Sequence, residues 1–518
     1  MTHFIFIITL LPVFLFFSPK VDGNTLNKII YHTAITAKPE SIDPKDVRNV
    51  FSVQIASPVL EGLVKLNEDL DIVPAIAKKW EIRNDGKEIV FYLRQGIKFH
   101  NGKEVHAKDV VYSLSRLIRE DDEHLFFHSF DNIVGVKSFK EKKEKQIKGI
   151  ISVDEYTVLI KFNNPNPTFY QILATPNCAI LPENFAENKN NKIEHYPIST
   201  GPFKVDSWLD DKIILSRYEE YHGKQPQIQK LIFHVMKDEE IISAFENNQI
   251  HDTFALSMYH DVPIKSSSHY IVETKIPLLY FLAINTRQFP FNNISFRRAL
   301  QYGLDRKRLL KEVFPGETPA YSNIPYGIGG YSIEKGKYRY NPEKAKKLLV
   351  ETKLPKKILV KKTIIWARVS MPNKEKFKKI IEENLSDIGL NIEVRFLTSK
   401  EFFDRFYARN LGIFYAGHNV NLNDARYVLS WYESTTQQNF TGMNNSQFDF
   451  LISLAREEKD DYIRSRIFSK ADEILSDEAV QIVLYNKILR THVKTNVKNF
   501  MVSALGPTVK YEQMELIP

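Results

Sequence analysis

The sequence predicts an α/β protein made of two α/β lobes with β-rich material between them. Its 518 residues are 43% hydrophobic and 26% charged, an ordinary globular composition, and at ~150 residues per domain the length corresponds to about three domains. Strand, helix and strand patterns follow one another around residues 230–256 and 361–397, which implies parallel pairing through right-handed crossovers. Alternating patterns such as Trp80–Arg94 supply the additional β structure.

The chain begins with an apolar segment typical of export. Phe4–Phe17 is a run of 14 uncharged residues, which is too short to span a bilayer but suits the core of a signal peptide. Val21 and Gly23 are suitably placed for cleavage before Asn24, although retention as an anchor stays open. No cysteine lies nearby, so a lipoprotein is excluded. We expect a soluble, periplasmic mature protein.

The first elements after this segment follow from local patterns. Trp80–Arg94 is predicted to form a hairpin that turns at Asn84-Asp85-Gly86. Apolar residues from Ala107 onward recur at helical spacing, and Tyr156–Phe162 alternates as a strand.

The remaining elements supply the two α/β patterns. Lys230–Met236 is predicted as a strand, Asp238 as the cap of the next helix, and His251–Leu256 as extended chain. Asn341 and Pro342 mark another helix start. The second pattern comprises a strand at 361–369, a helix that ends at Gly389, and a strand from Ile392 to Phe396.

Charge and motif content exclude several function classes. The net charge is +8, but the densest basic run, 137–145, alternates lysine with glutamate and is interpreted as a solvated loop, not a nucleic-acid site. A single cysteine, Cys178, excludes intramolecular disulfides and cysteine-ligated zinc domains. The sequence lacks the G-x-S-x-G, H-E-x-x-H, Walker A and G-x-G-x-x-G motifs. We therefore expect no enzyme activity, no cofactor and no metal.

One polar loop has the position of a ligand site. The apolar strand 411–416 runs directly into Gly417–Asp424, which is rich in Asn, Asp and His. In open α/β sheets, ligands bind beyond the carboxyl ends of strands. The alternative is a solvent loop made of turn-forming residues.

Ordered motifs across nearly the whole chain give a family resemblance. They are Ser41-Ile42-Asp43-Pro44, Leu60-Glu61-Gly62-Leu63, 74–77, 80–82, 89–102, 107–113, Ser199-Thr200-Gly201-Pro202-Phe203, 285–306 and 445–449. In this order they resemble the extracytoplasmic solute-binding proteins of ABC importers, in the oligopeptide, dipeptide and nickel-binding group.

The resemblance implies a two-lobed periplasmic-binding-protein fold of type II with an inserted domain. Lobe I is expected at 24–57, 198–278 and 486–518, the inserted domain at 58–197, and lobe II at 279–485. Two chain crossings between the lobes would form the hinge. The resemblance also implies structural roles for Trp80, His100, Asp109 and the helices near Arg297–Arg306.

The polar loop corresponds to the family's ligand anchor but differs from it. Peptide binders usually carry A-G-W-x-x-D-Y-x-D/E-P here, and the first Asp pairs with the ligand's ammonium group. This chain has His418 for the Trp, Asn421 for that Asp, Leu422 for the Tyr and Ala425 for the Pro, while Asp424 keeps its acid. An amide loses the charge-assisted bond. His418 is expected to add pH dependence between pH 5 and 8.

The expected function is a periplasmic receptor that captures a peptide or peptide-like solute and delivers it to a membrane permease and ATPase complex. The alternatives are a periplasmic sensor for a signalling receptor, or a binder of a metal chelate, haem or sugar. We expect a monomer with no nucleic-acid partner. The candidate ligand-binding residues are His418, Asn421, Asp424, Tyr280 and Lys38.

Overall fold

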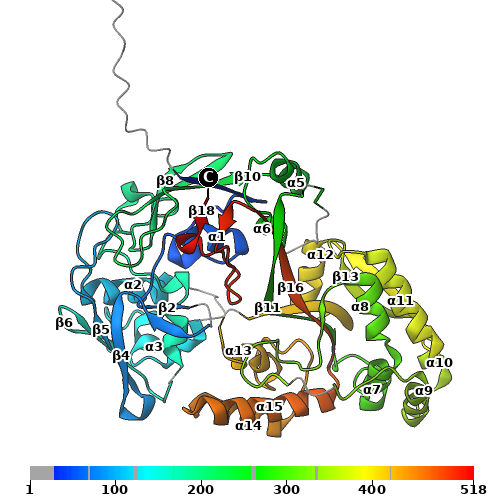
Figure 1. The fold of residues 1–518 in the computed structure, drawn as a ribbon. Helices are drawn as coiled ribbons and strands as arrows, with labels where there is room; N and C mark the ends of the chain where they lie inside the picture. Colours follow the sequence, from blue (N-terminus) through cyan, green and yellow to red (C-terminus); the bar gives the residue numbers. More distant parts are fainter. Residues whose placement is uncertain are drawn as a thin grey trace, which may run out of the picture.

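The computed structural model describes residues 29–67, 70–120, 127–166, 168–257, 264–265, 267–332, 336–420 and 422–517. The predicted export segment, Phe4–Phe17, and the candidate residue Asn421 lie outside this part of the chain. Within the described ranges, no helix has both the length and the apolar character to cross a bilayer. Three units surround the middle of the molecule (Figure 1), and each has a sheet of its own.

The first unit is built on a four-stranded sheet with the order β1-β10-β9-β8. Its elements are β1 (Ile30–Ile35), β8 (Phe203–Trp208), β9 (Lys212–Arg217), β10 (Lys230–Val235), α1 (Val50–Ala56), α5 (Asp238–Glu246) and α6 (Phe254–Ser257). The core includes Tyr31, Phe203, Phe233 and Tyr511, all at most 1% exposed. The C-terminal strands β17 (Val497–Lys498) and β18 (Glu515–Leu516) form a separate antiparallel pair.

The predicted strand–helix–strand pattern at 230–256 is wrong. β10 and α5 form, but the parallel partner of β10 is β1, from about 200 residues earlier in the chain. The segment predicted as extended turns into α6, where the Asp252 carboxylate accepts a hydrogen bond from the Phe254 backbone N–H at 2.8 Å. The N-cap of α5 is Lys237, and Asp238 is the first helical residue.

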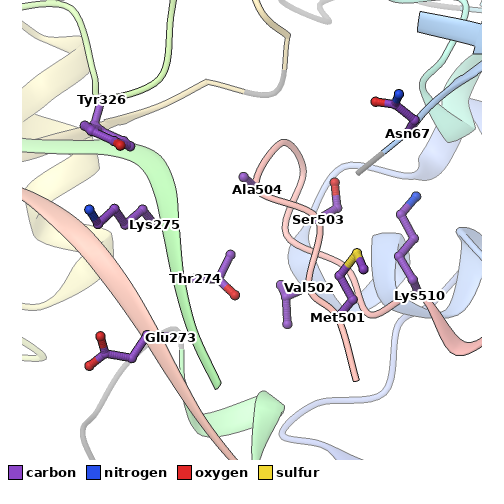
Figure 2. A pocket seen from close by; sticks show the side chains of 10 residues that line it. All are labelled: Asn67, Glu273, Thr274, Lys275, Tyr326, Met501, Val502, Ser503, Ala504 and Lys510. Carbon is purple, nitrogen blue, oxygen red and sulfur yellow. The ribbon is translucent and has the colours of Figure 1, made fainter. Parts of the chain in front are cut away.

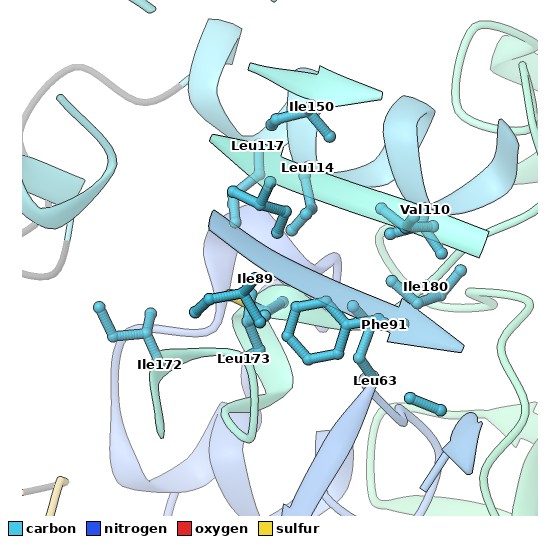
Figure 3. Packing of buried hydrophobic residues seen from close by; sticks show 14 of the residues in the cluster. Leu63, Ile89, Phe91, Val110, Leu114, Leu117, Ile150, Ile172, Leu173 and Ile180 are labelled. Carbon is cyan, nitrogen blue, oxygen red and sulfur yellow. The ribbon is translucent and has the colours of Figure 1, made fainter. Parts of the chain in front are cut away.

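The second unit contains the antiparallel sheet β4-β5-β7-β6. Its elements are β2 (Val64–Leu66), β3 (Ile72–Pro74), β4 (Ala77–Arg83), β5 (Glu88–Leu93), β6 (Ile150–Asp154), β7 (Thr157–Lys161), α2 (Ala107–Glu120), α3 (Val136–Lys140) and α4 (Phe169–Ile172). The predicted hairpin is present as β4 and β5, joined by a turn over Asn84–Gly86. Leucine and isoleucine side chains of α2, β5 and β6 belong to one hydrophobic cluster with Phe91 (Figure 3).

The third unit contains the six-stranded sheet β12-β16-β11-β15-β13-β14. Its strands are β11 (His269–Ile284), β12 (Thr318–Pro319), β13 (Thr363–Arg368), β14 (Ile392–Leu397), β15 (Ile413–Asn419) and β16 (Gln481–Lys494). The helices are α7 (Ile294–Gly303), α8 (Arg306–Val313), α9 (Pro342–Glu351), α10 (Lys356–Leu359), α11 (Lys374–Asp387), α12 (Ser399–Tyr407), α13 (Arg426–Leu429), α14 (Ser446–Glu457) and α15 (Asp461–Glu478). The predicted second pattern is confirmed, because β13 and β14 pair in parallel and α11 lies between them in the chain.

Two long strands join the first unit to the third. β11 and β16 pair antiparallel and run between the two units in Figure 1. Ile276 and Leu278 of β11 belong to the core of the first unit, whereas Leu282 and Ile284 belong to the core of the third. The register shifts between Lys275 and Leu279, so the ladder is irregular at the crossing point.

The units also touch away from these strands. Leu422, from the loop after β15, is 2% exposed and lies in the hydrophobic core of the second unit. Leu505, from the C-terminal segment, is 3% exposed and lies in a cluster with Val420 and Val428 of the third unit. The Lys459 ammonium forms an ion pair with Asp85 of the hairpin turn at 3.0 Å. All three units are therefore in mutual contact around the middle of the molecule.

Candidate functional site

A cavity of about 260 Å³, called the central cavity here, lies where the three units meet. The first unit contributes Val47–Val50 and Val53, the second contributes Glu61, Gly62, Val64–Leu66 and Ala174–Asn177, and Asn419 comes from the end of β15 in the third. The C-terminal loop contributes Ser503, Leu505–Thr508, Lys510 and Glu512. A molecule in this cavity would be within reach of all three units.

A second cavity, the hinge cavity, adjoins the crossing strand. It has a volume of about 450 Å³ and is lined by Glu273–Lys275 of β11, Tyr326, Asn67, Met501–Ala504 and Lys510. Figure 2 shows Tyr326 and Lys275 on one side, Asn67 and Lys510 on the other, and the loop 501–504 between them. Ser503 and Lys510 line both cavities, so the two adjoin each other.

Glu61 in the wall of the central cavity is held by a buried polar cluster. Its carboxylate accepts hydrogen bonds from Thr200 Oγ1 at 2.9 Å and from Tyr221 OH at 3.3 Å, and it lies 2.7 Å from His222 Nε2. The side chain is 6% exposed. Desolvation, followed by the nearby Glu61 carboxylate, raises the pKa of the Tyr221 hydroxyl above its ordinary value. The second carboxylate-bearing residue in this wall, Glu512, forms part of the short turn at 511–513.

His418 lies outside both cavities, in an aromatic cavity of about 200 Å³ within the third unit. Its ring stacks on Phe281 at 4.7 Å, meets Trp431 edge-on at 4.9 Å, and its Nε2 is 3.0 Å from Tyr432 OH. Phe402, Phe406 and Phe440 also line this cavity. Burial lowers the pKa of His418 to about 3, so the ring is neutral from pH 5 to 8. The expected pH dependence from His418 in that range is therefore wrong.

Among the described candidate residues, Tyr280, Asp424 and Lys38 do not line the aromatic cavity with His418. Tyr280 pairs with Gly417 on the neighbouring strand and stacks on Tyr415 at 5.3 Å and Tyr485 at 4.9 Å. Because adjacent residues of a strand point to opposite faces, Tyr280 lies on the face opposite to Phe281 and His418.

Asp424 and Lys38 each interact with a protein group outside the three cavities. The Asp424 side chain is buried, and its Oδ1 accepts a hydrogen bond at 2.8 Å from the backbone N–H of Arg426, at the start of α13. The Lys38 ammonium pairs at 3.0 Å with Asp210, whose side chain is fully exposed. Neither residue lines the three cavities described above.

Sequence reasoning missed the residues that line the central cavity. Lys510 lies more than 400 residues from Arg48 and Lys65, and no local pattern marks these residues as neighbours. A partial signal exists in Leu60-Glu61-Gly62-Leu63, one of the motifs of the family resemblance, because its first three residues line the central cavity.

Comparisons with known proteins agree on one family. Residues 71–440 match the model of the bacterial extracellular solute-binding proteins, family 5 middle. Heme-binding protein A of Haemophilus influenzae is 27% identical over 94% of this chain and 92% of its own length. The dipeptide-binding protein of Escherichia coli is 25% identical over 90% of this chain and 91% of its own length.

A solved structure shows the same fold. The structure of HbpA2 from Haemophilus parasuis superposes with a TM-score of 0.80 at 22% identity, covering 94% of this chain and 100% of the other.

Proposed function

The chain belongs to the bacterial extracellular solute-binding proteins of family 5, and from this premise we propose that it is the periplasmic receptor of an ABC importer. It captures a peptide or peptide-like solute between two lobes and delivers it to a membrane permease. The name of one relative, the dipeptide-binding protein of Escherichia coli, supports a ligand of this class, and the name of heme-binding protein A fits the alternative of a haem ligand. The proposed role contains no chemical step, since the receptor only binds, closes and releases.

The central cavity is the observation that carries this proposal. Its walls come from all three units, and Asn419 places the end of β15 directly at the cavity. A ligand that contacts separate units stabilises their closed arrangement by its differential affinity for that state. Capture by closure therefore follows from where the lining residues come from.

The proposed lobes follow the three sheets. We assign 24–57, 198–278 and 486–518 to lobe I, 58–197 to the inserted domain and 279–485 to lobe II. The separate hydrophobic clusters support these boundaries to within a few residues, since Val59 and Leu60 pack with the first unit. The irregular crossing at Lys275–Leu279 is the proposed hinge.

We further propose that the segment from His418 to Asp424 contributes to ligand binding. Asn419 in this segment lines the central cavity, and His418 lines the adjacent aromatic cavity, which supports the assignment. Asn421 keeps its predicted role opposite the ligand's amino terminus on the strength of the loop alignment alone. Asp424, Tyr280 and Lys38 remain predictions that the cavity linings do not support.

Native mass spectrometry of the protein purified from its own periplasm tests the proposal. We expect the mature chain, beginning near Asn24, to carry a small-molecule adduct that denaturation removes. Adding the released compound back to stripped protein should raise the melting temperature, because ligand at a hundredfold excess over Kd adds about 2.7 kcal/mol to the free energy of unfolding. Recovery of an adduct-free chain with an intact amino terminus from the cytosol would contradict the receptor function.

A further inference from the structure

The wall of the central cavity carries five charged side chains, Arg48, Glu61, Lys65, Lys510 and Glu512. Glu61 is already satisfied by the protein, through Thr200, His222 and Tyr221. Lys65 belongs to the same cluster, because its ammonium lies 4.0 Å from the Glu61 carboxylate and donates to Tyr221 OH at 3.4 Å. These two side chains offer no net charge to a ligand.

Arg48 and Lys510 are in a different situation. The guanidinium of Arg48 makes one long contact, from Nε to the Lys45 carbonyl at 3.5 Å. Among the described residues, the Lys510 ammonium has no hydrogen-bond or ion-pair partner. Against these two cations stands one remaining carboxylate, that of Glu512. Arg48, Lys510 and Glu512 together therefore give this part of the cavity wall a net charge of +1.

The backbone holds Lys510 in a defined place. Its N–H donates to the Met501 carbonyl at 3.0 Å, and the Ser503 N–H donates to the Thr508 carbonyl at 2.8 Å. Val502 and Val509 form a bridge between these bonds, so 501–510 is a small hairpin. In Figure 2 the Lys510 side chain extends toward the side of the hinge cavity where Asn67 lies. Lys510 thus lines both cavities, and its backbone is fixed by the hydrogen bonds of this hairpin.

We propose that the ligand carries a carboxylate group that Lys510 and Arg48 bind at the central cavity. The inference rests on the proposed function and names the class of solute: a peptide with a free carboxyl terminus, or another small organic acid. An ammonium enclosed by a closing cavity without an anion is costly, whereas a carboxylate supplies both charge and hydrogen-bond acceptors. Such a charge-assisted bond corresponds to about a ten- to hundredfold gain in affinity.

The sequence of the loop after β15 is consistent with this assignment. The sequence places an amide, Asn421, where peptide binders carry an acid, and His418 is neutral. An amide at this position of the loop offers a ligand's amino group no charge-assisted hydrogen bond. Recognition would depend on the acidic end of the ligand.

Calorimetry with three matched peptides tests the inference. The probes are trialanine, trialanine amide and N-acetyl-trialanine, each titrated into mature protein stripped of bound ligand. The variants are Lys510→Gln and Arg48→Gln. The matched control is Lys347→Gln, which removes an exposed lysine of α9 outside the cavity linings. Circular dichroism and melting curves confirm that each variant is folded.

We expect trialanine to bind about ten- to a hundredfold more tightly than its amide, and N-acetyl-trialanine to keep most of that affinity. Lys510→Gln and Arg48→Gln should each reduce the acid-to-amide ratio, and Lys347→Gln should leave it unchanged. Equal binding of acid and amide by the wild type would overturn the inference while leaving the receptor function intact. A co-purified ligand without an acidic group would do the same. Absence of both peptide binding and any co-purified ligand would instead contradict the proposed function itself.

Discussion

Leu422 links the third unit to the second, and its truncation provides a sharp test of closure. The side chain is 2% exposed because it enters the hydrophobic core of the second unit. Full burial of a leucine is worth about 1.5–3 kcal/mol relative to exposure. If the units separate when ligand leaves, Leu422 is buried only in the closed form, and its contribution belongs to the closing equilibrium.

Leu422→Ala should therefore weaken ligand affinity by about ten- to a hundredfold, since about 1.4 kcal/mol of binding free energy corresponds to a tenfold change in Kd. The melting temperature of ligand-free protein should change little. The matched control is Leu117→Ala, which truncates a residue of α2 that is 3% exposed in the same cluster but lies wholly within the second unit. That variant should lose about 2–5 kcal/mol of unfolding free energy and largely keep its affinity.

The assay combines calorimetry with the ligand released from the purified protein and urea unfolding of the ligand-free chain. If Leu422→Ala destabilises the ligand-free protein as much as Leu117→Ala does and leaves affinity unchanged, Leu422 belongs to a permanent interface. That result would refute the inference that Leu422 is buried only when the units close on ligand.

Three further outcomes follow from the sequence and the structure. Burial lowers the pKa of His100 to about 4 from its ordinary 6.5, so the unfolded chain takes up a proton that the folded chain does not. Stability is lost as pH falls from about 6.5 to 4, and His100→Gln should reduce that loss by about 1.4 kcal/mol per pH unit in urea titrations; an unchanged slope would reject the assignment. Asp43 accepts two hydrogen bonds from Arg116 at 2.7 and 2.6 Å in a buried pair, so Arg116→Met should cost about 3–5 kcal/mol by chemical denaturation, and a loss under about 1 kcal/mol would disprove the role. Asn421→Asp should raise affinity for peptides with a free amino terminus about ten- to a hundredfold, but not for N-acetylated ones, as calorimetry would show; equal effects on both would mean the loop alignment is wrong.

Elements with complete local signals could be predicted from sequence. Asn341 accepts from the Lys344 N–H at 2.9 Å, as expected for a cap followed by proline at the first helical position. The turn at Asn84–Gly86 was also predictable from its own residues. Asp85 and Gly86 both have positive φ, a conformation that Asp tolerates and Gly favours. These features depend on a few consecutive residues and are encoded there.

Features that depend on distant segments were not predictable in the same way. β10 pairs with β1, which comes from the N-terminal segment about 200 residues earlier. The residues at 230–256 contain no pattern that identifies this partner. The cationic wall likewise assembles from Arg48 and Lys510, more than 400 residues apart. His418 lies in the predicted loop region, but its neutrality follows from surrounding aromatic rings contributed by β11, the short helix Ser430–Tyr432 and the 438–441 segment.

Small-angle scattering of the mature protein, with and without the ligand released from it, tests ligand-coupled closure most directly. Calorimetry must first show that the ligand is bound at the concentrations used. Capture by closure predicts a smaller radius of gyration with ligand, and a smaller change for Leu422→Ala at subsaturating ligand. An unchanged radius of gyration in a fully bound sample would contradict capture by closure.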